Sequence, residues 1–343
     1  MKKTTAFFLT IGVLAMIVGG IGGAVYFRRA ENSMVDVKKQ TYEIKDKQSK
    51  KEIHLNLSGN AEFYILTENS NKVVMNSRSS LPVSIKSTLD VKEKNNQLLI
   101  SANSDQRKKE FEGLKFGFFD RGSAVTLTIP DDTERLIIDG KAEGSIHLSN
   151  AATKDLAIAF TNSDINVNDV NAEKLSIKTT NGYLNVFNDV RADEATFQTT
   201  NGDIQVNDFT ASKWSANSTS GSISLSDIKG ITNIETSNGD IQVTNLKGEA
   251  QAKTTNGSFS LYGTEIPKKL LVESQQGDIQ VNTEEILYDV TIKTKTQLGD
   301  STIFGKERTS FKRGKGTKSF TLQTNSGDIS VDGPSDYEDG EDD

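Results

Sequence analysis

The C-terminal half of the chain repeats one short pattern, in which apolar and polar residues alternate on both sides of a glycine. In one copy, Leu175 and Ile177 precede Gly182, and Leu184 and Val186 follow it. Alternation with a period of two is typical of a strand that buries one face. The pattern therefore predicts two short strands per copy, which meet at the glycine.

The copies recur at a nearly constant interval of 18 to 20 residues. Asn-Gly between two strands is the strongest short hairpin signal, so a set of antiparallel hairpins is the alternative. The constant interval favours a stack of coils, because one copy is too small to bury its own apolar face and stacked copies form a continuous core. The repeated glycines are Gly182, Gly202, Gly221, Gly239, Gly257 and Gly277, with Gly299 and Gly327 following after longer insertions and an earlier copy without glycine at 162–165.

The turn residues lead to three further expectations. Glycine supplies a positive φ without a Cβ clash, and aligned residues such as Thr200 and Asn201 are expected to form side-chain ladders along the stack. Asp follows the glycine only at every second copy, at Asp203, Asp240 and Asp278. Carboxylates two coils apart are separated by ~9.6 Å, near the Debye length, which limits their repulsion. We therefore expect solvated turn carboxylates.

Residues 50–150 are less regular but contain short alternating runs bounded by turn residues, such as KEIHLNL and AVTLTIP. The same architecture is therefore expected to begin near Lys50 and to continue into the regular repeats of 151–332. An insertion over 103–122 interrupts it and carries four phenylalanines beside Lys and Arg. It could bind a membrane surface or a partner, but unpaired solenoid edges must be covered, which favours a cap. The candidate interaction residues are Phe111, Phe116, Phe118 and Phe119.

The N-terminal segment is apolar and uncharged from Ala6 to Phe27. A helix of that length, at ~1.5 Å per residue, crosses a bilayer. A removed signal peptide usually has a shorter apolar region that ends in small residues. We therefore expect an uncleaved single-pass anchor over 6–27, between a flank over 1–5 and a linker over 28–49. Basic residues precede and follow the segment, so the charge pattern leaves the orientation open.

Composition and charge exclude several classes of protein. Hydrophobic residues make up 34% of the chain and there is no cysteine, which rules out disulfides and thiolate metal sites. The net charge of −7 arises in seven acidic residues at and beyond Asp332, with no basic residue among them. This predicts a disordered acidic tail over 333–343. The rest of the chain has no basic field that would attract nucleic acid.

The residues predict no catalytic, cofactor-binding or metal-binding site. Calcium-binding rolls have one residue between glycine and aspartate, whereas Gly202 and Asp203 are adjacent. Carboxylates two coils apart do not match the close pairs of glycosidases. His54 and His147 lie at alternating strand positions without partner motifs, which indicates packing or surface roles.

The run AVTLTIPDDTERLIIDGKAEGSIHL, the aromatic insertion before it and the T-x-N-G-D-I-Q-V copies resemble the bacterial "putative adhesin" family of unknown function. With its single anchor the chain is similar to the LiaG-type members, which are associated with envelope-stress operons of Gram-positive bacteria. The resemblance covers about residues 50–332. It implies an all-β solenoid at the cell envelope, outside the membrane, with an envelope protein or a glycan as partner. We expect a non-enzymatic scaffold, adhesin-like module or stress-response accessory; a glycan-active solenoid enzyme is the alternative.

Overall fold

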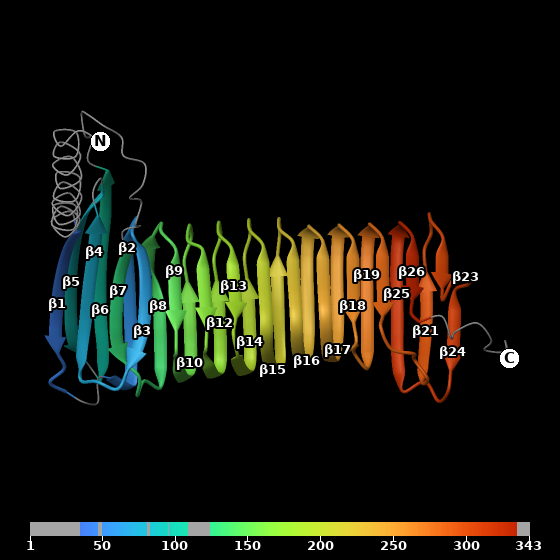
Figure 1. Cartoon of the computed structure of the whole chain (residues 1–343), viewed down its shortest axis with the longest axis horizontal. Helices are drawn as coiled ribbons and strands as arrows, with labels where there is room; N and C mark the ends of the chain where they lie inside the picture. Colours follow the sequence, from blue (N-terminus) through green and yellow to red (C-terminus); the bar gives the residue numbers. More distant parts are fainter. Residues whose placement is uncertain (1–34, 47–49, 81–82, 95, 109–123, 335–343) are drawn as a thin grey trace, which may run out of the picture.

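The computed structural model describes residues 35–46, 50–80, 83–94, 96–108 and 124–334. These residues form a 26-stranded sheet wound into an elongated stack of flattened coils (Figure 1). The expected all-β solenoid is confirmed. None of the described residues forms a helix long and apolar enough to cross a membrane. The expected anchor over 6–27 and most of the acidic tail lie outside the described residues.

Each coil contributes its first strand to one sheet and its second strand to the opposite sheet. We call these the charged sheet and the amide sheet, after the outward side chains described below. In stacking order, the charged sheet consists of β6 (Gln97–Lys108), β2 (Glu52–Gly59), β8 (Arg135–Ala142), β10 (Ala152–Ala159), β12 (Asn171–Lys178), β14 (Val190–Gln198), the second parts of β15 (Ile204–Ser218), β16 (Ile223–Asn238) and β17 (Ile241–Asn256), β19 (Lys269–Gln276), β25 (Lys318–Ser326) and β21 (Val290–Lys295).

The amide sheet stacks the second strand of each coil in the same direction. It consists of β7 (Ala124–Pro130), β3 (Glu62–Glu68), β9 (Ile146–Ser149), β11 (Ile165–Asn168), β13 (Leu184–Phe187), the first parts of β15, β16 and β17, β18 (Phe259–Gly263), β20 (Ile279–Thr283), β26 (Ile329–Asp332) and β22 (Ser301–Ile303). Neighbouring strands within the stack pair in parallel. The alternative of antiparallel hairpins at the repeated glycines is therefore excluded.

Equivalent apolar residues lie above one another in the core. Ile241 pairs in register with Ile223 on one side and Phe259 on the other. All three side chains are at most 1% exposed. A single coil could not bury them, whereas stacking removes each from water on both sides. The expected core columns are therefore confirmed.

The order of the coils at both ends departs from the order of the sequence. At one end, the coil of β6 and β7 lies outside the coil of β2 and β3. At the other, β25 and β26 lie between β19–β20 and β21–β22. The glycine column therefore runs Gly277, Gly327, Gly299, and not in chain order as we expected. This arrangement places the last described coil between two neighbours, so that it is not an open edge.

Antiparallel strands cover both ends of the stack. At the C-terminal end, β24 (Ser310–Arg313) pairs with β21, and β23 (Lys306–Glu307) pairs with β22. At the N-terminal end, β5 (Val83–Lys94) pairs with β6, β4 (Lys72–Ser80) pairs with β7, and β1 (Val35–Glu43) pairs with β4. Such covers occupy the backbone groups that the last coils would expose to other chains.

Two of the expected boundaries are wrong. The segment 28–49, expected to be a linker, contains β1, because its alternating residues complete the cover over β4. The insertion was expected to begin at Asn103, but β6 continues to Lys108 in register with β5. Among the described residues, β5, β4 and β1 cover the N-terminal end of the stack. The four phenylalanines of the insertion lie outside the described residues.

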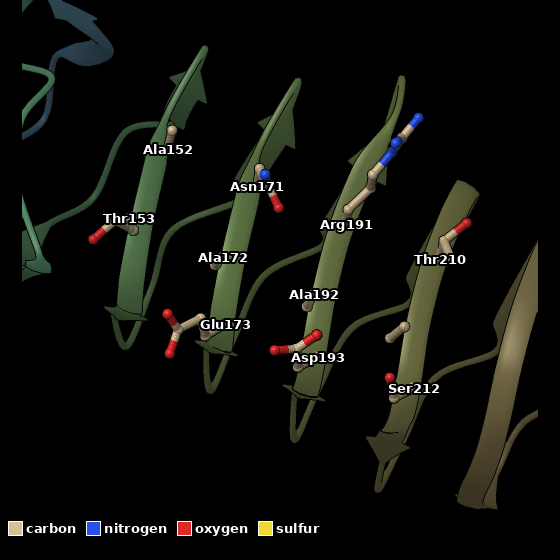
Figure 2. A pocket seen from close by; sticks show the side chains of 11 residues that line it. Ala152, Thr153, Asn171, Ala172, Glu173, Arg191, Ala192, Asp193, Thr210 and Ser212 are labelled. Atoms are coloured by element: carbon tan, nitrogen blue, oxygen red, sulfur yellow. The ribbon is translucent and has the colours of Figure 1, made fainter.

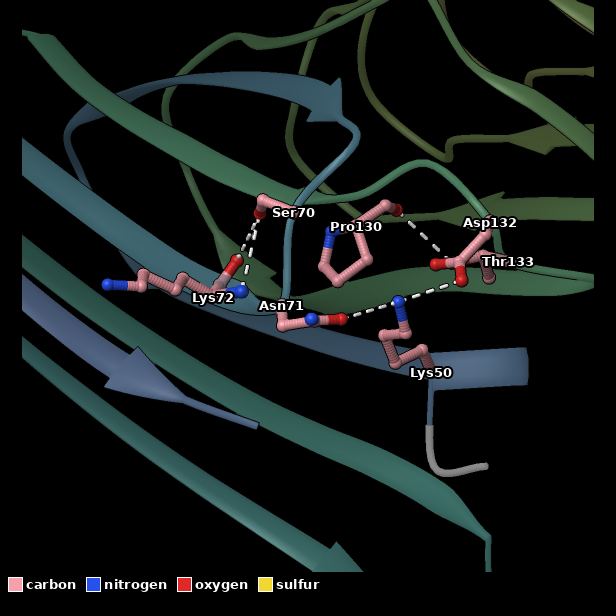
Figure 3. A network of polar contacts seen from close by, with 7 residues as sticks. All are labelled: Lys50, Ser70, Asn71, Lys72, Pro130, Asp132 and Thr133. Atoms are coloured by element: carbon pink, nitrogen blue, oxygen red, sulfur yellow. Dashed lines mark hydrogen bonds and ion pairs between the residues drawn. The ribbon is translucent and has the colours of Figure 1, made fainter. Parts of the chain in front are cut away.

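A nearly buried lysine ties the N-terminal cover to the coils (Figure 3). The Lys50 side chain, from the segment before β2, donates to Asn71 Oδ1 at 2.8 Å and pairs with Asp132 Oδ2 at 2.7 Å. Asn71 precedes β4, and its carbonyl accepts the amide of Ile44 at 2.9 Å. Lys50 is only 8% exposed, so water replaces these contacts poorly when they are lost.

We expect Lys50→Met to lower the stability of this end by about 1.5–3 kcal/mol, the usual contribution of a hydrogen bond to a charged group. Hydrogen exchange of β1 and β4 amides measures the effect. The control is Lys51→Met, because the Lys51 side chain is 58% exposed and lies 3.3 Å from Glu134; it should change exchange little. Equal effects of both substitutions would contradict a specific role for Lys50.

Candidate functional site

The repeated glycines form one column of turns, and each lies against the glycine of the neighbouring coil. A Cβ on Gly239 would lie 2.3 Å from the carbonyl oxygen of Gly221, and one on Gly257 would lie 2.0 Å from that of Gly239. The φ of Gly182, Gly202, Gly221, Gly239 and Gly257 is not in the left-handed region. Our expectation that the repeated glycines supply a positive φ is therefore wrong for these five, and it holds for Gly277, Gly299 and Gly327, whose φ values are +146°, +148° and +141°. All of them permit close approach of successive backbones.

A buried hydroxyl column stands beside the glycines and was missed in the sequence. Three residues before each glycine from Gly202 onward, a Thr or Ser donates a hydrogen bond to the glycine carbonyl of the neighbouring coil, for example Thr236 to Gly221 at 2.8 Å. In the sequence, this column corresponds to the first Thr of the T-T-N-G motif. We had expected ladders only from the second Thr and the Asn. The other donors are Thr199, Ser218, Thr254, Ser274, Thr296 and Thr324.

The expected asparagine ladder is present on the solvent side of the same turns. The Asn201 amide donates to Asn181 Oδ1 at 2.8 Å, and that of Asn181 donates to Asn162 Oδ1 at 2.9 Å. A second step joins Asn256 to Asn238 at 2.8 Å. These bonds align successive turns and hold this edge of the stack straight.

The turn carboxylates bridge coils and are not merely solvated. Asp240 Oδ1 accepts the backbone N–H of Ser258 at 2.8 Å, and Asp203 Oδ1 accepts that of Ser222 at 2.8 Å. The alternation of Asp also ends at the C-terminal end, where Asp278, Asp328 and Asp300 occupy successive coils. Each of the first two accepts the amide of the next Asp, which offsets the repulsion that we expected to forbid such neighbours.

We expect Asp240→Asn to be nearly neutral, because its amide oxygen can still accept the Ser258 N–H. Asp240→Ala should cost about 0.5–1.5 kcal/mol, the usual net contribution of one hydrogen bond. The difference in unfolding free energy between the two variants measures the bridge. Equal stability of both would show that this hydrogen bond contributes nothing.

The amide sheet presents an uncharged outer surface over several coils. The exposed carboxylates Asp208 and Asp227 stand at the corners where β15 and β16 pass from this sheet to the charged sheet. At the other outward strand positions from β11 to β20, the residues are all amide, hydroxyl or aromatic. They are Asn166, Asn168, Asn185, Phe187, Gln205, Asn207, Ser224, Ser226, Gln242, Thr244, Ser260, Tyr262, Gln280 and Asn282. The opposite sheet differs, because neighbouring strands there carry charges of alternating sign at Arg135, Asp155, Lys174, Glu194 and Lys213.

Between β15 and β20, the outward residues of the amide sheet repeat every two coils. Gln205, Gln242 and Gln280 alternate in register with Ser224 and Ser260. We call the coils with Gln amide coils and those with Ser hydroxyl coils. Within the described part of the chain, none of these five side chains makes a hydrogen bond to another residue. The glutamine amides are therefore free to bind a partner.

Comparison with family models decides the family. The model named Toastrack DUF4097 matches residues 50–233 and 187–332, which together span most of the chain. The chain belongs to the Toastrack DUF4097 family. The matched residues include every coil of the two sheets, so the toastrack domain comprises the whole stack. The resemblance to a family of "putative adhesins" of unknown function is confirmed.

Three solved structures that match the chain carry related descriptions. A "putative adhesin" from Bacteroides fragilis is 18% identical, with a TM-score of 0.43, over 72% of this chain and 96% of its own. One from Parabacteroides merdae is 12% identical, with a TM-score of 0.45, over 73% and 97%. A "putative cell adhesion protein" from Clostridium sporogenes is 11% identical, with a TM-score of 0.22, over 87% and 100%. No curated protein matches the chain.

The toastrack domain also has a groove of about 490 Å³ on the charged sheet (Figure 2). Its floor consists of the small side chains of Ala172, Ala192 and Ala211, which are paired in register. Glu173 and Asp193 project from neighbouring strands along one side. This groove contains no histidine, and its carboxylates make no hydrogen bonds to other described residues that would fix them for chemistry.

Both histidines of the toastrack domain pair with a carboxylate. His147 Nε2 lies 2.8 Å from Glu62 Oε1, and its ring stacks on Tyr64 with centroids 4.4 Å apart. Burial, followed by the hydrogen bond to Glu62, raises the pKa of Tyr64. His54 Nε2 lies 2.9 Å from Asp139. No group of three His, Asp or Glu side chains in the described residues is placed to hold a metal ion.

Proposed function

We propose that the chain is a non-enzymatic interaction module of the cell envelope. The segment 6–27 anchors it in the membrane as a single-pass helix, and the toastrack domain lies outside. It acts there as an adhesin-like scaffold or as an accessory of the envelope-stress response. The observation that carries the proposal is the outer surface of the amide sheet, where uncharged side chains with free amides form a flat and continuous face.

A flat face of this kind suits binding better than chemistry. The backbone bonds between coils, the buried hydroxyl column and the asparagine ladder hold its strands in fixed register. Because the strands are already in fixed register, little backbone conformational entropy is lost when a partner binds. The exposed amides offer both donors and acceptors, which favours a partner rich in hydrogen-bonding groups.

One observation favours a glycan-active enzyme as the second candidate. Asp278, Asp328 and Asp300 lie in successive coils, roughly 5 Å apart, near the separation of the carboxyl pair in retaining glycosidases. Asp328→Asn tests this candidate. An enzyme would lose glycan cleavage while glycan binding persists, whereas a binding module shows no cleavage in either form.

Crosslinking in intact cells tests the proposed function. The variant Gln205→Lys, Gln242→Lys, Gln280→Lys places three charges on the amide sheet, two coils apart. The matched control, Ser176→Lys, Ser215→Lys, Gln251→Lys, has the same spacing on the charged sheet. We expect the first to lose its crosslinks to envelope components and the control to keep them. Equal crosslinking of both, or equal loss, would overturn the proposal.

Fractionation tests the anchor. The full chain should pellet with membranes and resist carbonate extraction, and a shortened chain that begins at Glu31, before β1, should be soluble. Protease added to intact protoplasts should cleave the toastrack domain. Release of the protein into the medium with a new N-terminus near residue 25 would identify a cleaved signal peptide and overturn the anchor.

A further inference from the structure

The two-coil repeat of the amide sheet involves three columns of outward residues, not one. Each amide coil carries Asp at its turn, Gln at the middle of its strand and a polar residue beyond, as in Asp203, Gln205 and Asn207. The next hydroxyl coil carries Ser222, Ser224 and Ser226 at the positions in register with them. The set then returns as Asp240, Gln242 and Thr244, and again as Asp278, Gln280 and Asn282.

The alternation of the middle residue begins at Gln205. In the two coils before it, Asn166 and Asn185 are both amides, and the Asn185 amide donates to Asn166 Oδ1 at 2.9 Å. The coil of Asn185 also carries Tyr183 and Phe187. Between β11 and β20, the outward aromatic residues Tyr183, Phe187 and Tyr262 all lie in the phase of the hydroxyl coils. Tyr183 is 53% exposed and Tyr262 is 50% exposed. From Gln205 to Gln280, long amide side chains and short hydroxyl side chains thus alternate from coil to coil.

The repeat distance of this alternation is ~9.6 Å along the stack, because neighbouring coils are ~4.8 Å apart and the pattern repeats every two coils. A core requires apolar residues in every coil and imposes no two-coil period on the outward residues. A repeat of two on a fixed surface is complementary to a ligand that also repeats in pairs. An extended polymer whose successive units face opposite ways has such a repeat.

We propose that the amide sheet binds a neutral, extended polysaccharide whose successive sugars alternate in orientation, laid along the long axis of the stack. This inference rests on the proposed function and names its partner. Every second sugar would meet a glutamine amide, which can donate to and accept from hydroxyl or acetamido groups. The sugars between them would lie over a hydroxyl coil, where Tyr183, Phe187 or Tyr262 can contact the apolar face of a ring.

The charges of the face favour a neutral ligand. The turn carboxylates Asp203, Asp240 and Asp278 line one side of the glutamine column. Each of the first two uses one oxygen on the neighbouring coil, which leaves the other to accept a ligand hydroxyl. The strands from β11 to β20 present no cation to this surface, so a phosphate or sulfate polymer would be repelled.

Titration calorimetry with the full chain tests the inference, with oligomers of β-linked N-acetylglucosamine of increasing length as the probe. We expect affinity to rise with each added pair of sugars, because each pair engages one more amide coil. Maltose-series oligomers of equal length, which coil helically, and the polyanion heparin should bind at least about ten-fold more weakly. Equal binding of all three probes, or no binding of the first, would overturn the inference.

Three variants separate the repeat from the mere presence of amides. The first is a triple variant, Gln205→Ala, Gln242→Ala, Gln280→Ala, which should weaken binding at least about ten-fold. The second is its matched control on the charged sheet, Ser176→Ala, Ser215→Ala, Gln251→Ala, which should not weaken binding. Ser224→Gln, Ser260→Gln gives every coil between Gln205 and Gln280 an amide, so the two-coil period is lost. We expect weaker binding; tighter binding would show that amide number and not spacing matters, and would overturn the inference.

The outcomes distinguish the inference from the function on which it rests. If the oligomers do not bind but the lysine variant of the amide sheet still loses its envelope crosslinks, this inference is wrong and the proposed function stands. If the lysine variant and its control crosslink equally, both are wrong. Circular dichroism and melting of each variant confirm that the fold persists.

Discussion

Ile241→Asp is expected to unfold the middle of the stack, at a cost of at least about 4 kcal/mol. Ile241 is fully buried, and its neighbours in the adjoining coils are Ile223 and Phe259. A carboxylate there has no partner, and either its burial or its protonation requires much free energy. Because each coil contacts only its neighbours, the damage should be centred on β16, β17 and β18.

Hydrogen exchange of the strand amides, together with thermal melting, measures this effect. The control is Ile241→Val, which removes one methyl group and should cost about 0.5–1.5 kcal/mol. A fully stable Ile241→Asp protein would contradict the burial of this residue between two coils. Loss of protection at the distant β2 and β8 but not at β17 would contradict its position.

Gly239→Ala is expected to have the second largest effect, a loss of at least about 2 kcal/mol. The new Cβ would lie 2.3 Å from the Gly221 carbonyl oxygen, which is backbone and cannot rotate away. The two coils must therefore separate at this edge, which would weaken the Thr236 bond to Gly221 and the strand pairing beside it. The unfolding free energy in denaturant measures the loss.

The matched control is Gly305→Ala. Gly305 has a φ of +71°, and no atom lies within 4 Å of the position that a Cβ would take there, so only the left-handed backbone is strained, at about 1–2 kcal/mol. Gly239 has no positive φ, so an account based on turn conformation alone expects Gly239→Ala to be harmless and Gly305→Ala to be worse. That order of stabilities would contradict the close approach of coils.

The repeated part of the fold could be predicted from the sequence because the repeat itself identifies which segments lie next to each other. Alternation before and after Gly202 or Gly239 identifies two strands, and the constant interval identifies the coil above and below. The order of the end coils could not be predicted, because the copies at Gly299 and Gly327 carry the same pattern and either could follow Gly277. The antiparallel covers, β1 among them, have no repeat from which to recognise their partners.

The candidate face was visible in the sequence but was not recognised. Avoided repulsion would explain why Asp203, Asp240 and Asp278 alternate with other residues, but it concerns only the column of turn residues. Gln205, Gln242 and Gln280 keep the same phase two residues later. Only the structure shows that both columns face outward on one sheet. The phenylalanines of the insertion stand out by residue type, but they lie outside the described residues.

Both proposals depend on parallel coils stacked in one amide sheet, and disulfide formation tests that stacking directly at its last coils, β20, β26 and β22. The chain has no cysteine, so an introduced pair is the only one present. Gln280 pairs with Ser330, and Ser330 with Thr302. Gln280→Cys with Ser330→Cys should therefore oxidise readily, because neighbouring coils are ~4.8 Å apart and a disulfide spans Cα separations of roughly 4.4–6.8 Å. Gln280→Cys with Thr302→Cys, two coils apart, should remain reduced; a disulfide in the second protein and not in the first would contradict the stack.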